Sequence, residues 1–279
     1  MQNFKEYLGL GIAGNFAMHL DQAGEAEDFK DITTEDETAP KGIFPFYLPK
    51  RVDGIKEILS VYPISSSTIR LPDATSNVQA EPEVCLVCDI IYDGDNVSKI
   101  VPNKFCAYND CSIRVAGADK ISDKKNWGED SKGMSKTLLD IDKFEEGSVM
   151  EEFSITSFLR RDGKLIQYGE DATLTGYSYF YEKLLSWIVN QINTQKDFGP
   201  LENIKDYIFQ CGNPKKLIIS IGATRYTPYG ETTFLKDGDE VVVALYKHNE
   251  ISFEELKENI LHRDYALENT SILSQKVVL

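Results

Sequence analysis

Apolar residues along the chain follow the spacing of buried strands more often than that of helices. Continuous apolar runs predict buried strands at 83–91, 217–221 and 241–246. Two further runs, at 153–159 and 164–168, flank an Asp-Gly pair, and this dipeptide between two such runs is typical of a β-hairpin turn. The pattern therefore predicts a β-rich fold.

Three helices are expected beside these strands. Apolar side chains between Tyr177 and Ile192 recur at helical spacing, which predicts an amphipathic helix with one face on the core. Ser252, followed three residues later by Glu255, forms a capping box that opens a C-terminal helix. A short helix is expected at 15–24, after a glycine-rich turn.

Composition narrows the classes of partner. Of the 279 residues, 42% are hydrophobic, which is enough for a full core. Lys and Arg number 30 against 45 Asp and Glu, and the net charge of −15 disfavours nucleic acid and anionic membrane surfaces as partners. No apolar run reaches the ~18 residues of a membrane-spanning helix, and the first residues lack the pattern of a signal peptide. We therefore expect a cytoplasmic protein.

The five cysteines, an odd number, argue against a disulfide framework. Cys85 and Cys88 have the CxxC spacing of metal sites, but they lie within an apolar strand. Residues three apart on a strand point to opposite faces, so both cannot chelate one ion. We predict that these thiols are free and buried.

Gly9, Gly11 and Gly14 form a GxGxxG pattern directly before the expected short helix. In a dinucleotide-binding fold this pattern is followed by a second buried strand that carries an acid for the ribose. No run of even three apolar residues occurs between 28 and 40. We therefore expect no nucleotide cofactor, and we interpret the glycines as a tight turn with close backbone packing.

The segment from Asp21 to Thr38 holds eight acidic residues and one base. Because like charges repel one another, a solvated or lid-like loop is the expected structure.

Two carboxylates stand together at the start of the strand predicted at 83–91. Glu81 and Glu83 bracket Pro82, and the period of two puts both on one face of the chain. Asp110 follows another short apolar run and adds a third carboxylate at a strand end. Three carboxylates around Mg²⁺ or Ca²⁺ leave about three positions open for substrate and water. The alternative is that these are solvated surface acids.

Seven short motifs follow one another over residues 9–247. They lie at 15–24 (NFAMHLDQAG), 81–87 (EPEVCLV), 109–114 (NDCSIR), 127–132 (a Trp and a later Lys), 162–167 (DGKLIQ), 222–230 (GATRYTPYG) and 235–241 (LKDGDEV). In this order they resemble the motifs of the fumarylacetoacetate hydrolase superfamily, which includes acylpyruvate hydrolases and oxaloacetate decarboxylases.

The resemblance implies an α+β, β-rich fold. In this family the core is a mixed β-roll or β-sandwich, of the type of the family's C-terminal domain, with peripheral helices. Members are usually homodimers and bind Mg²⁺ or Mn²⁺ through the E-x-E pair and the Asp of N-D-x-S. Here these ligands correspond to Glu81, Glu83 and Asp110, and Ca²⁺ also suits such oxygen ligands.

The resemblance also implies roles for other residues. The family's signature His, here His19, acts as a general base under a helical lid that closes over a 2-oxo acid. Gln22 stands where the family has the glutamate that assists this base. Lys132 would neutralise the substrate carboxylate or a developing enolate. The substrate-binding positions implied by the motifs are Asn15, Arg114, Gln167 and Thr224.

The chain departs from the family pattern at several positions. Gln22 cannot hold a proton as a glutamate can, and Asp21 lies on another helix face. Val115 replaces an Asp, Lys132 is one residue further from the tryptophan than usual, and 222–225 read GATR where the family has Gly-Thr-Pro.

These observations predict one structural unit with three parts: a small N-terminal layer with lid and acidic loop (1–75), a catalytic β-roll (76–250) and a C-terminal helical extension (251–279). The leading hypothesis is a divalent-metal-dependent hydrolase or decarboxylase that cleaves a C–C bond in a small anionic 2-oxo or 1,3-diketo acid. Two alternatives stay open: a protein of this fold that has lost catalysis and serves in binding or regulation, and an isomerase of 2-oxo acids.

Overall fold

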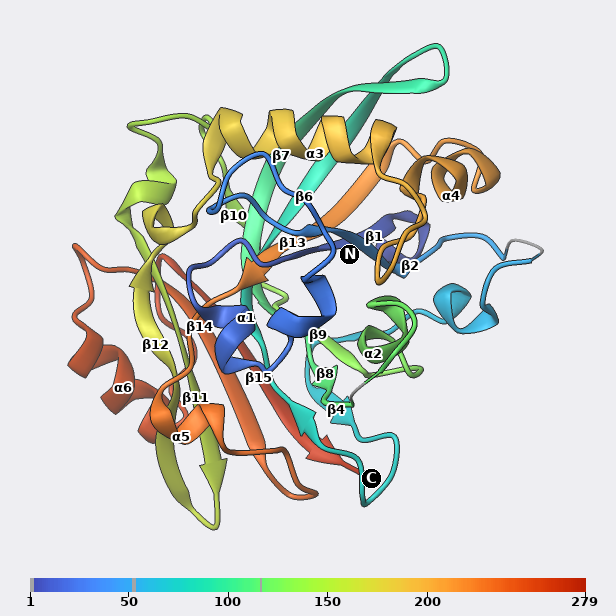
Figure 1. Ribbon diagram of the computed structural model, residues 1–279. Coiled ribbons are helices and arrows are strands. Elements are labelled where there is room, and N and C mark those ends of the chain that lie inside the picture. Colours follow the sequence, from blue (N-terminus) through green and yellow to red (C-terminus); the bar gives the residue numbers. More distant parts are fainter. Residues whose placement is uncertain (1–2, 52–53, 116) are drawn as a thin grey trace.

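A mixed, curled sheet forms the larger part of the molecule. The computed structural model describes residues 3–51, 54–115 and 117–279. Among these residues the larger sheet has eight strands, in the order β2-β1-β13-β6-β7-β9-β3, with β10 beside β7 (Figure 1). Their bounds are β1 (Leu8–Ala13), β2 (Gly42–Tyr47), β3 (Ile64–Ser65), β6 (Pro82–Asp93), β7 (Asn96–Asn109), β9 (Lys132–Met134), β10 (Leu139–Asp140) and β13 (Lys216–Ala223). The β1–β13 and β3–β9 pairs are parallel, and the other pairs are antiparallel.

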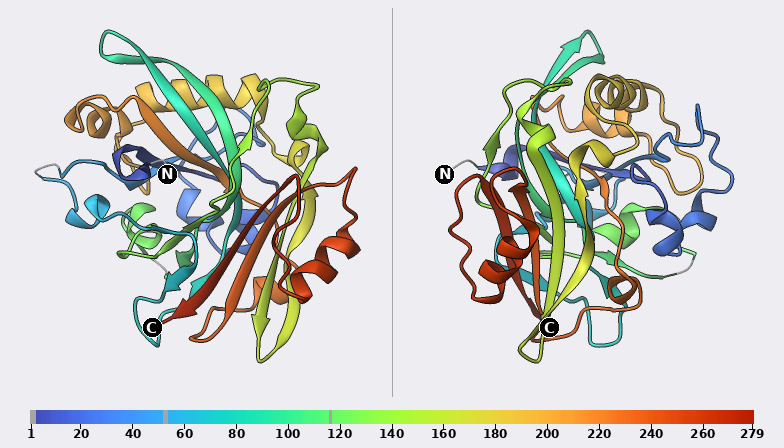
Figure 2. Two further views of the ribbon diagram at one scale, coloured as in Figure 1. Left: turned by 180° about the vertical axis from the view of Figure 1, so that it is seen from behind. Right: turned by 90° about the vertical axis from the view of Figure 1, so that its left-hand side faces the viewer.

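A second sheet has five strands in the order β12-β11-β14-β15-β4. Its strands are β4 (Thr68–Arg70), β11 (Phe153–Arg161), β12 (Lys164–Thr173), β14 (Glu240–Lys247) and β15 (Thr270–Val278). A small ladder pairs β5 (Val78–Gln79) with β8 (Ser112–Ile113). Figure 2 shows from behind and from the side that the two larger sheets form one body.

The helices lie at the periphery of the sheets. They are α1 (His19–Gln22), α2 (Ser122–Lys125), α3 (Tyr181–Thr194), α4 (Ile204–Gln210), α5 (Pro228–Glu231) and α6 (Phe253–Leu261), with 3-10 turns at Phe4–Glu6, Ala26–Phe29, Glu57–Ser60, Val149–Glu152 and Leu174–Gly176. Helix α3 packs against β7 and β2, and α6 covers the second sheet through Leu256 and Ile260. The α+β, β-rich class and the mixed β-roll with peripheral helices are thereby confirmed.

Several predicted elements are present. Asp162 and Gly163 both have positive φ in the turn between β11 and β12, as a two-residue hairpin turn requires. The Ser252 side chain accepts a hydrogen bond from the Glu255 N–H and caps α6. All five cysteines are free and buried, and Cys85 and Cys88 pack in different clusters.

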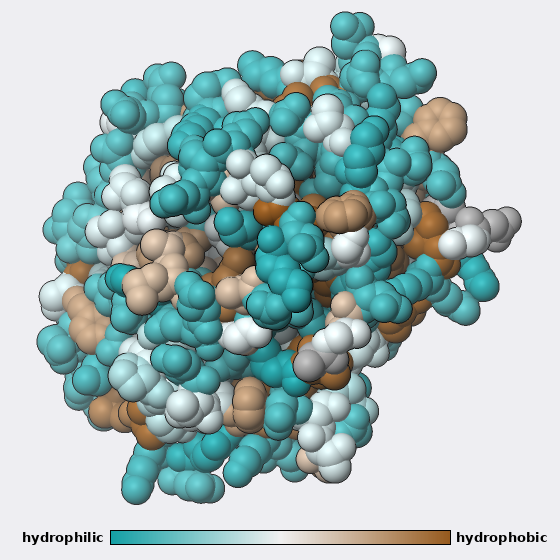
Figure 3. Space-filling model, viewed as in Figure 1, coloured by the Kyte–Doolittle hydropathy of each residue, from teal (hydrophilic) through white to brown (hydrophobic). Residues whose placement is uncertain are grey.

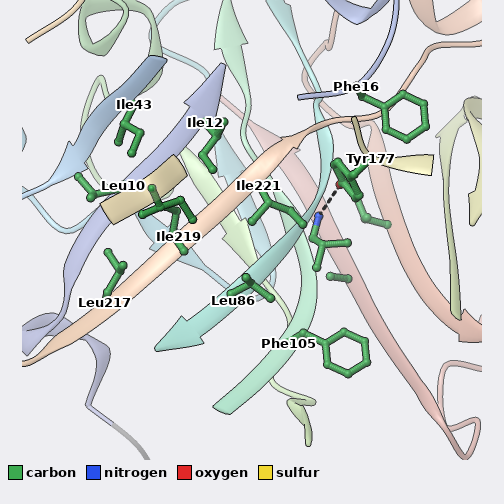
Figure 4. Close-up of a cluster of buried hydrophobic side chains, with 14 of the residues drawn as sticks. Leu10, Ile12, Phe16, Ile43, Leu86, Phe105, Tyr177, Leu217, Ile219 and Ile221 are labelled. Atoms are coloured by element: carbon green, nitrogen blue, oxygen red, sulfur yellow. Dashed lines mark hydrogen bonds between the residues drawn. The ribbon is translucent and has the colours of Figure 1, made fainter. Parts of the chain in front are cut away.

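The predicted helix from Tyr177 to Ile192 begins later than expected, at Tyr181. The Tyr177 ring lies in the main apolar cluster with Phe16 (Figure 4), and its hydroxyl donates to the carbonyl of Gly222 and accepts from the Val84 N–H. Tyr177 therefore belongs to the core, as expected, but it precedes the helix instead of opening it.

The expected helix at 15–24 is reduced to the single turn α1. Met18 adopts a left-handed conformation with φ of 66° directly before it. Asn15 is fully buried and bonds the backbone of Ile221 and Tyr179, so it does not join the helix.

The glycine-rich segment is a strand and not a tight turn. Gly9 and Gly11 lie in buried β1, and a Cβ on them would come within 2.4 Å of Phe46 and 2.3 Å of Phe44. Close packing therefore requires these two glycines. The predicted close backbone packing is present, but the predicted tight turn is not. Among the three, Gly14 has the positive φ, 75°.

The longer strands β1, β2 and β15 and the short strands β3, β4, β5, β8, β9 and β10 were not predicted. Strand β15 lies between β14 and β4, so residues 270–278 form an interior part of the second sheet. The division of the chain into three parts stays a prediction.

The face in Figure 3 is largely hydrophilic with scattered hydrophobic residues. Within the described ranges, no helix combines the length and apolar character needed to cross a membrane.

Candidate functional site

Three carboxylates meet where β6 begins and β7 ends. These strands are antiparallel neighbours, and the Asp110 N–H donates to the Glu81 carbonyl over 2.9 Å. One oxygen each of Glu81, Glu83 and Asp110 lies within 4.8 Å of the others, and all three residues are buried. The structure thus brings the three sequence-predicted acids together, and by spacing alone they could hold one metal ion.

Positively charged nitrogens already contact both oxygens of two of these acids. Lys125 Nζ lies 2.6 Å from Glu81 Oε2 and 2.7 Å from Asp110 Oδ2. The other Asp110 oxygen is 2.6 Å from Lys132 Nζ, and the other Glu81 oxygen is 2.8 Å from an Arg114 nitrogen. Each oxygen of Glu81 and Asp110 therefore has a cationic partner within the protein.

The ion pairs continue outward from Arg114. This guanidinium also contacts Glu25 at 2.6 Å, Glu25 contacts Lys124 at 2.9 Å, and Lys124 reaches Asp28 at 2.8 Å. The full sequence of contacts, which we call the ion-pair chain, is Asp28–Lys124–Glu25–Arg114–Glu81–Lys125–Asp110–Lys132. Four acids and four bases alternate along it, so the ion-pair chain is neutral when every member is charged.

This arrangement corrects the expectation of a solvated acidic loop at 21–38. Glu25 from that segment is buried and belongs to the ion-pair chain, because Arg114 and Lys124 compensate its charge. Asp28 is half-buried and pairs with Lys124, and the other acids of the segment are exposed, as expected.

Burial and neighbouring charges set the protonation states. Burial alone would raise the pKa of Glu81, but Lys125 and Arg114 hold it well below its usual range. The acids around Lys125, Asp110 first, overcome burial and raise the pKa of its ammonium group. Burial outweighs Asp110 at Lys132 and lowers the pKa of that lysine.

Glu83 differs from the other two acids. Within the described residues it forms no ion pair, and its Oε2 accepts the Gly222 N–H at 3.0 Å. Burial, together with the nearby Asp110 charge, raises its pKa well above the usual value. The surroundings of Glu83 therefore favour its protonated form, whereas those of Glu81 favour the carboxylate.

The resemblance found in the sequence implies a divalent ion at this centre. The residue types and their spacing suit Mg²⁺ or Mn²⁺. However, Lys125 Nζ bridges Glu81 and Asp110 in the way an ion would, and neither acid keeps an oxygen without a cation. As they are arranged here, the residues do not fit a bound divalent ion.

His19 lies beside this centre. It lines a small enclosed cavity of about 10 Å³ together with Glu81, Glu83 and Lys125, which is space for one water molecule at most. Burial lowers the pKa of His19 to about 4, so its imidazole is neutral at pH 7. Its buried Nδ1 has no hydrogen-bond partner among the described residues. A neutral ring with a free nitrogen can accept a proton.

Gln22 joins α1 to the segment after β13. Its Nε2 donates to the Tyr226 carbonyl over 3.1 Å, and its Oε1 accepts the Tyr226 N–H over 2.9 Å. The Gln22 amide thus pairs with both backbone groups of Tyr226, as a neighbouring strand would, and holds the α1 turn in place over His19. Asp21 is exposed and takes no part.

We expect Gln22→Glu to loosen this attachment, because a carboxylate can accept the Tyr226 N–H but cannot donate to the Tyr226 carbonyl. The loss of one hydrogen bond, about 1 kcal/mol, should speed hydrogen exchange at the Tyr226 amide about fivefold. Exchange measured by mass spectrometry on the peptide covering 222–231 checks this. Gln167→Glu on β12 is the matched control, and equal exchange in both variants would contradict the assignment.

The remaining sequence-predicted residues lie outside the small cavity. Gln167 bonds the Gly169 carbonyl of its own strand, and Thr224 bonds the carbonyl of Pro82. Asn15 supports the backbone, as described above. Lys132 and Arg114 reach the acids but not the cavity. Their substrate-binding roles, and that of Lys132, stay predictions.

Sequence reasoning missed Lys125, Lys124, Glu25 and Tyr226. Glu25 stands among the other charges of the acidic segment, so no pattern marked it as buried. The two adjacent lysines resemble any solvated basic pair, so no pattern marked them as buried.

A buried acid also supports the short helix that carries Lys125. Glu202 accepts a hydrogen bond from the Ser122 hydroxyl at the start of α2, and burial raises its pKa to about 7. In the unfolded chain the ordinary value is 4.5. Its stabilising contribution is therefore complete below pH 4.5 and is lost as the pH rises through 7.

Glu202→Gln should consequently raise the free energy of unfolding at pH 8 by up to about 3 kcal/mol, with little change at pH 4.5. Urea unfolding at both pH values measures this. Glu231→Gln, at an exposed position on α5, is the control. An equal effect of Glu202→Gln at both pH values would exclude the titration as its cause.

Comparison with known proteins places the chain in a family. A family described as of unknown function (DUF5718) matches residues 25–277. The chain belongs to this family. Among curated proteins, no sequence matches that of this DUF5718 member.

Solved structures share the fold of this DUF5718 chain at low identity. A putative fumarylacetoacetate hydrolase family protein from Yersinia pestis CO92 is 11% identical, with a TM-score of 0.54 over 97% of this chain and 93% of its own. A 5-carboxymethyl-2-hydroxymuconate delta-isomerase from Mycobacterium smegmatis is 14% identical, with a TM-score of 0.51 over 97% and 78%. A 2-keto-3-deoxyarabinonate dehydratase is 14% identical, with a TM-score of 0.53 over 97% and 73%. The chain therefore shares the fold of these fumarylacetoacetate hydrolase-type structures.

Proposed function

We propose that this protein is an enzyme that cleaves a C–C bond in a small 2-oxo or 1,3-diketo acid, by hydrolysis or decarboxylation. The observation that carries the proposal is the small cavity, where a neutral buried imidazole faces a buried ammonium group and carboxylates. The names of two structural neighbours, an isomerase and a dehydratase, also describe oxo or hydroxy acids.

His19 is the proposed base, which takes a proton from water or from the substrate. Lys125 lines the same cavity, so its fixed positive charge would stabilise an enolate that forms as the C–C bond breaks. Lys132 contacts Asp110 and is therefore proposed to hold that carboxylate in place. Mg²⁺ or Mn²⁺, expected from the sequence, would have to displace Lys125 to reach these acids.

The substrate is proposed to enter when α1 moves. A groove of about 590 Å³ lies on the other side of this turn, and it shares Gly14 and Leu20 with the small cavity. Leu20 packs within 2.7 Å of the position of a Cβ on Gly14, so its side chain separates the two spaces. Release of the Gln22 attachment would join the groove to the cavity.

A panel assay tests the proposed function. Acylpyruvates and oxaloacetate are incubated with the protein in EDTA, and separately with Mg²⁺ or Mn²⁺, and the C–C cleavage products are quantified. We expect turnover that is reduced about 10²–10⁴-fold by His19→Asn and retained by His262→Asn, which alters an exposed histidine at the end of α6. Turnover unchanged by His19→Asn would refute the role of this histidine.

A second candidate is a protein that binds such an acid without converting it. The ion-pair chain favours this reading, because every oxygen of Glu81 and Asp110 is already compensated. Binding of a substrate analogue such as oxalate, measured by calorimetry, without turnover in the panel would support it. An isomerase would instead give products of unchanged mass. The expected homodimer is a separate prediction, which light scattering in solution tests.

A further inference from the structure

The group that lies among the carboxylates is itself a cation. Lys125 Nζ contacts Glu81 and Asp110 at 2.6 and 2.7 Å, and the Phe44 ring lies 5.3 Å away on another side. We propose that the ammonium group of Lys125 stands in the place of a divalent cation and keeps Mg²⁺ and Mn²⁺ out of this centre. This inference goes beyond the proposed function, because it concerns occupancy of the centre and not turnover.

Neighbouring residues fix Lys125 in this position. The helix α2 that carries it is held at its start by the Ser122–Glu202 hydrogen bond. Directly after it, the Asn126 side chain donates to the backbone carbonyl of Phe46 over 2.8 Å. Lys125 therefore has little freedom to withdraw its Nζ from the acids.

The apolar side of the lysine is equally confined. Phe44 is 1% exposed, and its ring already fills the space that a Cβ on Gly11 would take. The ring cannot move toward β1 to admit a displaced lysine, because tightly packed interiors accommodate little extra volume. A displaced Lys125 would thus have to leave the interior altogether.

Charge balance leads to the same conclusion. The ion-pair chain alternates four acids with four bases, and the remaining acid, Glu83, has no cationic partner among the described residues. A divalent ion added to this set would leave at least one positive charge uncompensated in the interior, even if Glu83 released its proton. Buried charges without partners are strongly unfavourable, so the ion could bind only by replacing Lys125.

The test compares Mn²⁺ binding by the wild type, Lys125→Met and Lys104→Met. Methionine keeps an unbranched apolar side chain against Phe44 but removes the ammonium group. We expect no Mn²⁺ bound to the wild-type centre, and an affinity increase of more than about 100-fold in Lys125→Met. Lys104→Met, altered at a lysine whose ion pair with Asp140 lies at the surface and outside the ion-pair chain, should behave like the wild type. Calorimetry and Mn²⁺ electron paramagnetic resonance measure binding without any substrate.

The outcomes separate clearly. Mn²⁺ bound by the wild type and lost in Asp110→Asn would overturn the proposal, as would a folded Lys125→Met that binds no Mn²⁺. Weak binding to surface acids is recognised because it persists in Asp110→Asn. If Lys125→Met does not fold, Lys125→Gln, which keeps a polar group for the two acids, is measured with the same expectation. Absence of turnover in the panel assay leaves these readouts untouched, so failure of the proposed function is distinguishable.

Discussion

Replacing Asp110 by asparagine is expected to lower the free energy of unfolding by about 3–5 kcal/mol. Asparagine preserves the shape of the side chain but removes the charge that two buried lysines share. Among the described residues, Lys132, which is 0% exposed, would keep the Cys111 carbonyl at 3.3 Å and the Phe46 ring as its remaining partners. Lys125 would keep Glu81. A buried cation that loses its partner pays the desolvation cost uncompensated, whether it remains charged or releases its proton.

Chemical unfolding in urea measures this loss. The wild type and the variants are fitted with one shared m-value, the slope of the free energy of unfolding against urea concentration. Asp140→Asn is the matched control, because Asp140 pairs with Lys104 at the surface and exposed pairs contribute little. We expect the control to leave the unfolding midpoint unchanged. The same loss for Asp110→Asn should appear with and without EDTA. A variant as stable as the wild type would mean that Lys132 and Lys125 do not depend on Asp110.

The three acids were predictable because strand geometry fixes them. A period of two places Glu81 and Glu83 on one side of the chain, and Asp110 ends the neighbouring strand at the same level. Local patterns also gave the β11–β12 turn and the α6 cap. Each of these features depends on residues close together in the sequence or on one strand pairing.

Lys125 and Glu25 were not predictable in the same way. Each is buried only because its partners arrive from distant segments: Glu25 meets Arg114, and Lys125 meets Glu81. In the sequence, both stand among other charges, which normally mark a solvated segment. Charge complementarity among five separate segments is a tertiary property, and one sequence does not display it.

The glycine-rich segment was misread for a related reason. The GxGxxG spacing suggested a turn, but Gly9 and Gly11 are required by the rings of Phe46 and Phe44 on the adjacent strand β2. Those two rings lie 5.9 and 5.3 Å from the ammonium groups of Lys132 and Lys125. The glycines thus serve the centre indirectly, by admitting the aromatic residues that confine its lysines.

His19→Asn is expected to reduce kcat of the proposed reaction by about 10²–10⁴-fold, the usual contribution of a positioned base. Asparagine is polar and of similar size, but its amide accepts no proton near neutral pH.

Because burial lowers the pKa of His19 to about 4, the base stays neutral and competent throughout the physiological range. The kcat/KM of the wild type for a cleaved acylpyruvate should therefore be constant from pH 8 down to about 5 and fall only as the pH approaches 4. His248→Asn, at the residue directly after β14, should match the wild type at every pH. A decline centred near pH 6.5 would instead indicate a solvated imidazole, and with it a site more open than the closed turn over His19 allows.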